Sequence, residues 1–223
     1  MPVRKVSNRG GNIIGYFPSI KMGRMVAFES TIERDLIYLL DFAADVASFS
    51  EQPYTINYLK EGLKRSYTPD FHVHFRDGRQ LTLECKPEAL VNLEENLRKF
   101  TAGETWAVEQ AWEYQIITER VLRSGHQLAN VKFLTRYARH AIPPTVKQKI
   151  LRILDPGCWS GSISAIAGAV PSVTPALAMA AIFQMAFYHE LMVVGLHEKP
   201  IDLDAEVRNL AAGEQYEYPS LFG

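Results

Sequence analysis

The sequence predicts an α/β protein with a mixed sheet flanked by helices, followed by a small helical domain that carries a β-hairpin. Over the first 141 residues, short segments with an apolar residue at every second position alternate with longer helical patterns. The Pro143–Pro144 pair then interrupts the chain, because the residue before a proline is driven out of helical geometry. A chain of 223 residues suffices for one large domain or two smaller ones.

The elements before the proline pair are predicted from periodicity and from turn residues. Gly10 and Gly11 indicate an irregular arm over residues 1–28. In the hairpin, Phe71, Val73 and Phe75 share one face, whereas the polar residues between them share the other. In chain order we expect a helix at 30–43, two extended pieces within 45–60, a hairpin at 71–86, a helix at 89–112 and a strand leading into a helix from 114.

Three helical patterns follow the proline pair: TVKQKILRIL, SISAIAGAV and ALAMAAIFQMAFYHE. The segment LMVVGLHEKPIDLDAEV then predicts two strands with a turn at 197–200. Three helices and a hairpin are typical of a winged helix, which we place at 145–223. Its third helix has no Lys or Arg, so it is predicted to be buried or to contact a protein rather than to read DNA bases.

The composition is that of an ordinary globular protein, with 47% apolar and 22% charged residues. Cys85 and Cys158 are too few for a disulfide framework, which favours a reducing, intracellular compartment. The N-terminus has no apolar core of a secretory signal. Because Pro171 and Pro175 interrupt the uncharged run at 157–188, we expect no membrane segment.

Positive charge is concentrated at the front of the chain. The first 24 residues hold five basic side chains and no acid, whereas residues 145–223 hold five basic and eight acidic ones. Phosphate contacts need Lys and Arg, so the front is the better candidate for nucleic-acid binding. The same cations could equally be solvent-exposed residues of an N-terminal tail and of the hairpin turns, with no role in DNA binding. The candidate DNA-binding residues are Arg4, Lys5, Arg9, Lys64, Arg65, Arg76 and Arg79.

The hairpin also carries a candidate site for phosphodiester hydrolysis. Asp70 precedes its first strand, and Glu84 and Lys86 lie at the end of its second strand on the same face. Such hydrolysis uses Mg²⁺, for which Mn²⁺ is a substitute, held by two or three carboxylates. A nearby lysine can orient or deprotonate the attacking water. An exposed strand face also carries such residues routinely, so the pattern alone leaves both interpretations open.

A fourth acidic residue, Glu33, lies in the first turn of the first helix. Ser30 and Glu33 form a capping box, which alone accounts for the glutamate. Glu33 also borders the apolar stripe, where a carboxylate needs a partner such as a shared metal ion. Glu29 is the rival for this role. Among other polar residues we expect His72 and His74 to face solvent or phosphate, Cys85 to be in the core and Gln52 to be in a turn.

Four motifs in order resemble one family: FESTIERDLIYLLDF, FSEQPYTINY, RSYTPDFHVHFRDG and LTLECKP. They are similar to TnsA, the endonuclease subunit of heteromeric cut-and-paste transposases, which belongs to the restriction-endonuclease-like PD-(D/E)xK nucleases. WEYQIITERVLR and LANVKFLTRYAR extend the resemblance to about residue 140. The resemblance implies a restriction-endonuclease-like nuclease domain over 29–141, followed by the winged helix.

The resemblance also implies roles for individual residues. Glu33, Asp70, Glu84 and Lys86 match the catalytic positions of the family. The first three would bind Mg²⁺, and the main-chain carbonyl of Cys85 would complete its shell. A TnsA-like subunit cuts the 5′ strands at transposon ends, a TnsB-like transposase cuts and joins the 3′ ends, and a TnsC-like ATPase regulates both. Such a protein works on DNA in a bacterial cytoplasm.

Two alternatives stay open at this point. The chain could be a freestanding restriction- or repair-type nuclease that needs no transposase. It could also be a non-catalytic DNA-binding adaptor with the same fold, although the complete set of four catalytic residues argues against this.

Overall fold

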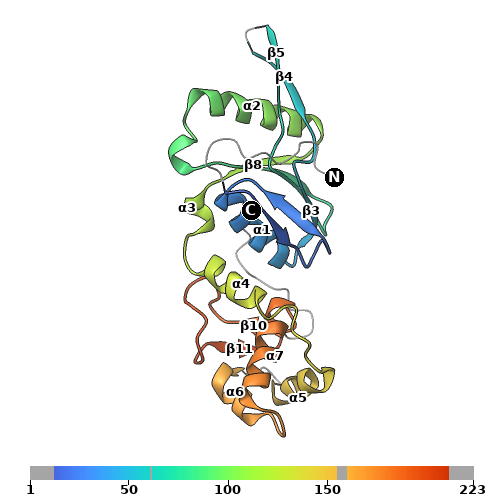
Figure 1. Ribbon diagram of the computed structural model, residues 1–223, viewed down its shortest axis with the longest axis vertical. Coiled ribbons are helices and arrows are strands. Elements are labelled where there is room, and N and C mark those ends of the chain that lie inside the picture. The colour runs from blue at the N-terminus through green and yellow to red at the C-terminus, as the bar shows by residue number, and fades with distance from the viewer. Residues whose placement is uncertain (1–12, 61, 155–159, 211–223) are drawn as a thin grey trace. The chain divides into compact units, whose positions relative to one another are not determined.

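The computed structural model describes residues 13–60, 62–154 and 160–210 (Figure 1). The chain divides into two compact units, the first ending at Leu122 and the second beginning at Arg123. This division lies about twenty residues before the expected boundary at Pro143 and Pro144. The reason is that residues 127–135, expected to belong to the first domain, pack within the second unit.

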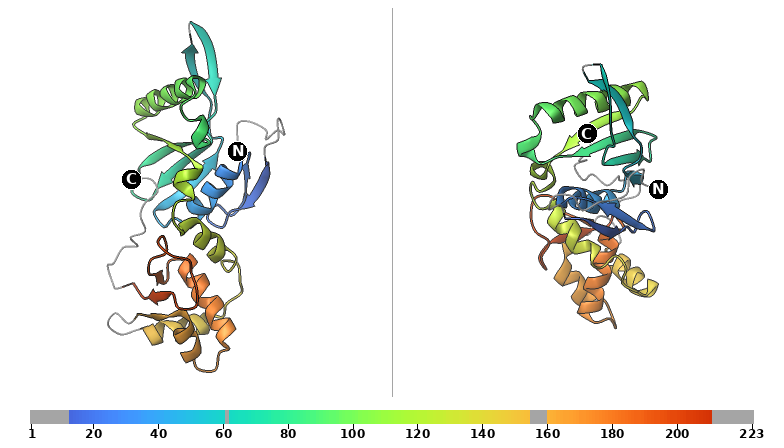
Figure 2. Two further views of the ribbon diagram at one scale, coloured as in Figure 1. Left: turned by 90° about the vertical axis from the view of Figure 1, so that its left-hand side faces the viewer. Right: turned by 45° about the horizontal axis from the view of Figure 1, so that its top comes forward.

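The first unit is built around a four-stranded sheet in the order β3-β6-β7-β8. Neighbouring strands are antiparallel except for the parallel pair of β7 and β8. Helices α1 and α2 cover opposite faces of this sheet in every view (Figures 1 and 2). The elements are β3 (Val46–Glu51), β6 (Phe71–Phe75), β7 (Gln80–Cys85), β8 (Glu113–Ile117), α1 (Thr31–Phe42), α2 (Glu94–Glu109), the short 3₁₀ helix η1 (Glu88–Leu90) and α3 (Glu119–Leu122). This mixed α/β arrangement agrees with the predicted nuclease fold.

The β6–β7 hairpin has the predicted alternation. Phe71 pairs with Leu83 and Val73 with Leu81, and these four side chains are at most 1% exposed. The opposite, polar face carries His72, which was expected to face solvent or phosphate but is only 4% exposed. The aromatic residues that cover His72 come from segments that are distant in sequence. They are Tyr54, whose ring centroid lies 5.6 Å away, and Trp112, at 4.3 Å.

Residues 13–28, expected to be part of an irregular arm, form a hairpin of β1 (Gly15–Pro18) and β2 (Met25–Phe28). Val26 is completely buried, so this hairpin belongs to the packed unit. Lys21 Nζ donates to the carbonyl of Val46 at 2.8 Å, and burial lowers the pKa of Lys21 to about 8. Arg24 forms two hydrogen bonds with Glu51, at 2.6 and 2.7 Å. These two cations therefore have structural partners. Arg4, Lys5 and Arg9 lie outside the described residues.

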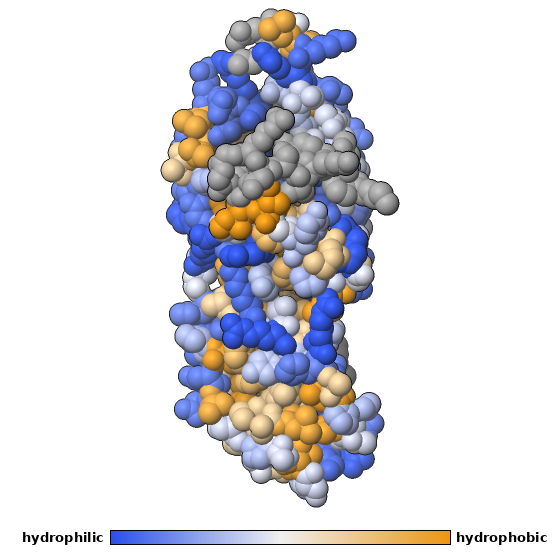
Figure 3. Space-filling view, viewed as in Figure 1, coloured by the Kyte–Doolittle hydropathy of each residue, from blue (hydrophilic) through white to orange (hydrophobic). Residues whose placement is uncertain are grey.

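A separate two-stranded hairpin, β4 (Ile56–Lys60) and β5 (Leu63–Tyr67), extends from the first unit beside α2 (Figures 1 and 2). Ile56, at its base, is buried, whereas Leu59 and Leu63 near its tip are 70% and 58% exposed. Hydrophobic and hydrophilic side chains lie next to one another at the tip, at the top of Figure 3. The base of the hairpin is thus fixed, and its tip is available for contact.

The second unit contains four helices and a three-stranded sheet in the order β10-β11-β9. Helix α7 is buried from Ala181 to Phe187, which explains why its sequence is apolar on nearly all sides. Asn130, in α4, donates to the carbonyls of Leu196 and Lys199, which ties α4 to this unit. The elements are α4 (Gln127–Thr135), α5 (Pro144–Leu154), α6 (Ile163–Ala169), α7 (Pro175–Phe187), β9 (Ser160–Ser162), β10 (Met192–Val193) and β11 (Glu206–Arg208).

Within the described ranges, no helix is both long and apolar enough to cross a bilayer.

Gly103, in the middle of α2, allows two tyrosines to approach the helix. A Cβ atom at this position would lie 1.9 Å from Tyr67 Oη and 2.5 Å from Tyr114 Cε2. Gly103→Ala should therefore lower the free energy of unfolding by about 1–3 kcal/mol, measured by thermal or denaturant unfolding.

Gly168→Ala is the matched control, because Gly168 also lies in a helix but a Cβ there would meet nothing within 4 Å. We expect this variant to gain up to about 1 kcal/mol from helix propensity. If both substitutions had the same effect, the close approach at Gly103 would not limit packing.

Candidate active site

A cavity of about 530 Å³ lies where the N-terminal turn of α1 meets the end of strand β7. All four residues expected to be catalytic line it. Helix α1 contributes Glu33, the start of β6 contributes Asp70, and the end of β7 contributes Glu84 and Lys86. The other lining residues are Glu29, Ser30, Ile32, Ser66, Tyr67, Thr68, Cys85, Pro87, Leu90 and Lys99.

Two backbone hydrogen bonds fix Asp70 in the cavity wall. The N–H of Cys85 donates to Asp70 Oδ2 at 2.7 Å, and the N–H of Gln52 donates to the Asp70 carbonyl at 2.8 Å. Gln52 is only 7% exposed and has a φ of 44°, in the left-handed region that residues other than glycine seldom adopt. Gln52 was expected to be a turn residue, and its backbone holds the start of β6.

Glu84 and Lys86 form an ion pair, with 3.5 Å between Lys86 Nζ and Glu84 Oε1. The other carboxylate oxygen, Glu84 Oε2, is buried and has no hydrogen-bond partner in the described part of the chain. Burial raises the pKa of Glu84, and the charge of Lys86 opposes that shift. Glu84 therefore presents one available oxygen to the cavity.

The pKa of Asp70 is raised well above its usual value, first by burial and then by the charges of Glu84 and Glu33. Lys86 and the hydrogen bond from Cys85 act in the opposite direction. Burial also raises the pKa of the Cys85 thiol, which at 7% exposure is the core residue that the alternation predicts. The cavity thus holds acidic groups that repel one another and are incompletely neutralised.

Glu33 also caps helix α1. Its N–H donates to Ser30 Oγ at 3.1 Å, and its Oε2 accepts from the Glu29 N–H at 2.8 Å. Glu33 therefore both takes part in the cap of the helix and lines the cavity. Glu29 lines the same cavity, and the charge of Glu33 is among the causes that raise the pKa values of Asp70 and Glu84.

The donor chemistry of this cavity fits Mg²⁺. Carboxylate oxygens are the ligands that this ion prefers, and it is often bound by one or two carboxylates while keeping several waters. Asp70 and the available oxygen of Glu84 meet that requirement. Among the described residues, however, no group of three His, Cys, Asp or Glu side chains is arranged to hold a metal ion. The carboxylates line one cavity without forming a closed three-ligand centre.

The four candidate DNA-binding residues within the described ranges occupy two places. Lys64 and Arg65 are exposed on β5, the strand that continues into Ser66 and Tyr67 of the cavity wall. Arg76 and Arg79 lie at the β6–β7 turn, which is the opposite end of the hairpin from Asp70 and Glu84.

The two arginines at this turn also have structural partners. Arg76 Nε donates to the carbonyl of Ala44 at 2.7 Å. Arg79 pairs with Asp77 at 3.0 Å, and its guanidinium carbon lies 4.5 Å from the centre of the Phe75 ring. Of the four candidates that the structure describes, only Lys64 and Arg65 therefore lie on an element that leads to the cavity.

Sequence reasoning missed Lys99, a second lysine in the cavity wall. It comes from α2, 13 residues after Lys86, and no short motif joins the two. Lys99 lies near Asn96 and Gly103, which are both buried, but their burial depends on how α2 packs and no local sequence pattern marks it. Tyr67, Ser66 and Thr68 were also missed, since they lie at the end of an otherwise exposed strand.

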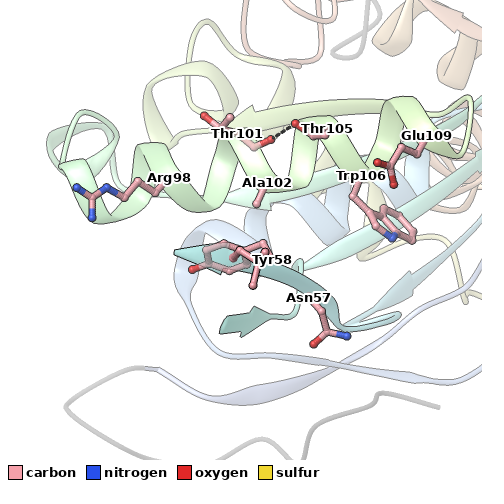
Figure 4. A pocket seen from close by; sticks show the side chains of 9 residues that line it. Asn57, Tyr58, Arg98, Thr101, Ala102, Thr105, Trp106 and Glu109 are labelled. Carbon is pink, nitrogen blue, oxygen red and sulfur yellow. Dashed lines mark hydrogen bonds between the residues drawn. The ribbon is translucent and has the colours of Figure 1, made fainter. Parts of the chain in front are cut away.

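A second cavity, of about 620 Å³, lies between α2 and β4. Tyr58 lies below α2 near Ala102, and Arg98 lies at one end of the cavity (Figure 4). Its only acidic lining residue is Glu109, so it lacks the carboxylate cluster of the first cavity.

Comparison with known proteins agrees with this geometry. Residues 43–119 match the family model described as TnsA-like endonuclease N terminal. This segment is a TnsA-like endonuclease N-terminal domain. The matched segment includes Asp70, Glu84, Lys86 and Lys99, whereas Glu33 precedes it. No curated protein matches the chain significantly.

The repulsion within the TnsA-like domain predicts a pH-dependent effect of Asp70→Asn. The folded-state pKa of Asp70 lies above its unfolded value, so ionisation destabilises the fold as pH rises through the folded pKa. The variant should therefore be more stable than the wild type at pH 7–8. This difference should vanish below about pH 4, where the carboxyl group is protonated in both states. Thermal unfolding across pH in the presence of a chelator measures it.

Asp77→Asn is the control, because Asp77 lies on the same hairpin but its pKa is lowered, first by its hydrogen bond from the Arg79 N–H. This variant should not gain stability at neutral pH. An Asp70→Asn protein less stable than the wild type at pH 8 would contradict the repulsion.

Proposed function

We propose that this chain is the Mg²⁺-dependent DNA endonuclease subunit of a heteromeric transposase and cuts the 5′ strands at transposon ends. One observation carries the proposal. In a segment that matches TnsA-like endonucleases, Asp70, Glu84 and Lys86 line a single cavity, and Glu33 joins them from the preceding helix. The cutting of the 5′ strands and the assembly with a transposase are inferred from the family resemblance.

The residues have separate roles in this proposal. Asp70 and Glu84 would hold the ion, and Glu33 and the main-chain carbonyl of Cys85 would be further oxygen donors. When bound, Mg²⁺ polarises the scissile phosphate and lowers the pKa of the attacking water. Lys86 orients that water and offsets the negative charge that grows at phosphorus in the transition state. Lys64 and Arg65 hold the DNA backbone beside the cavity.

The proposed partners are transposon-end DNA, a TnsB-like transposase and a TnsC-like ATPase. We also propose that the second unit is a winged helix. Its helix α7 is buried inside the unit and carries no Lys or Arg, which argues against base reading by this helix. A freestanding nuclease remains the alternative, and it would cut bare DNA without any partner.

Asp70→Ala should abolish Mg²⁺-dependent strand cutting by the assembled transposase while the subunit stays folded and assembled. Lys86→Ala should lower the rate by about 10²–10⁴-fold but leave metal binding intact, since Lys86 acts on the water rather than on the ion. Gel assays of 5′-strand cutting and calorimetry with Mg²⁺ measure the two effects.

Asp77→Ala removes a carboxylate from the far end of the same hairpin and should change neither result. Normal cutting by the Asp70→Ala protein would remove Asp70 from the mechanism. A wild-type chain that binds DNA but no Mg²⁺ would instead support a non-catalytic adaptor.

A further inference from the structure

Lys99 is a charged residue in the cavity wall to which the proposed mechanism gives no role. It lies in α2, is half-buried, and shares the cavity with Asp70, Glu84 and Lys86. No hydrogen bond or ion pair joins Lys99 to another residue in the part of the chain that the structure describes. Its charge acts on Glu84 at a distance, where it favours the ionised carboxylate. Lys99 therefore lines the site, and no described side chain there forms a hydrogen bond or an ion pair with it.

The excess of acidic side chains in the cavity explains why a second cation is needed to bind a DNA phosphate there. Four acidic side chains line it, namely Glu29, Glu33, Asp70 and Glu84. Lys86 is already paired with Glu84 at 3.5 Å. A DNA phosphate that approached these carboxylates would be repelled, and Lys99 is the lining cation that remains unpaired.

We propose that Lys99 binds a backbone phosphate of the DNA strand that enters the cavity, and that it acts as a substrate-binding residue distinct from Lys86. This inference rests on the nuclease function proposed above. A lysine ammonium binds phosphate as a point charge and carries no base specificity. Lys64 and Arg65 lie on β5, which continues into Ser66 and Tyr67 of the same cavity wall, so β5 and α2 both offer cations to a DNA backbone at this cavity.

The test measures binding of a short DNA duplex by fluorescence anisotropy across 50–200 mM salt, with Ca²⁺ in place of Mg²⁺ to prevent cutting. Lys99→Met should weaken binding several-fold and lower the slope of log K against log salt by about 0.9, because one phosphate contact is lost. Lys99→Arg should keep the slope. In the cutting assay, Lys99→Met should raise KM more than it lowers kcat, the reverse of Lys86→Ala.

Arg98→Met is the matched control. It removes the same charge one residue earlier, but Arg98 pairs with Glu94 and lines the other cavity (Figure 4). Its salt slope should equal that of the wild type. The inference would be overturned if Lys99→Met had the same salt slope as the wild type. It would also be overturned if Lys99→Met and Arg98→Met lost the same amount of DNA affinity. Failure of the wild type to bind Mg²⁺ or to cut, with the Lys99 slope effect intact, would overturn the nuclease function alone.

Discussion

Repulsion among buried and half-buried carboxylates is the constraint on which the site depends. Asp70, Glu84 and Glu33 come from three elements and line one cavity, where burial and like charge raise the pKa values of Asp70 and Glu84. An arrangement of this kind destabilises the fold unless cations balance it. Lys86 supplies part of that balance. The remaining negative charge is what the proposed divalent ion would balance.

The surrounding fold holds these groups together against their repulsion. Phe71 and Leu83 form the last pair at this end of the hairpin, and Asp70 and Glu84 are the residues next to them on the two strands. The Cys85 N–H then bonds directly to the Asp70 carboxylate. On the far side, Gln52 adopts an unfavourable backbone conformation while bonded to the Asp70 carbonyl. Strain at a position so close to a cluster of like charges is typical of functional sites.

Local patterns were sufficient to predict the hairpin and to place Asp70, Glu84 and Lys86 at the same end of it. Period-two alternation determines which side chains share a face, and the Ser30–Glu33 spacing determines the helix cap. The burial of His72 and the position of Lys99 could not be predicted, because both depend on how α2 and the segment after it pack on the sheet. The unit boundary was misplaced for a similar reason. The proline pair is a local break, whereas the contacts of Asn130 span more than 60 residues.

The pair of Arg24 and Glu51 links the N-terminal hairpin to the site. Glu51 ends strand β3, and the next residue, Gln52, holds the Asp70 carbonyl. Lys21 fastens the same hairpin to the carbonyl of Val46, at the beginning of β3. A shortened chain that started after residue 28 would thus lose the support of this strand at both ends, although every acidic residue of the cavity would still be present. The N-terminal hairpin therefore supports the strand that leads to the candidate site, and it should be kept whenever the domain is produced in isolation.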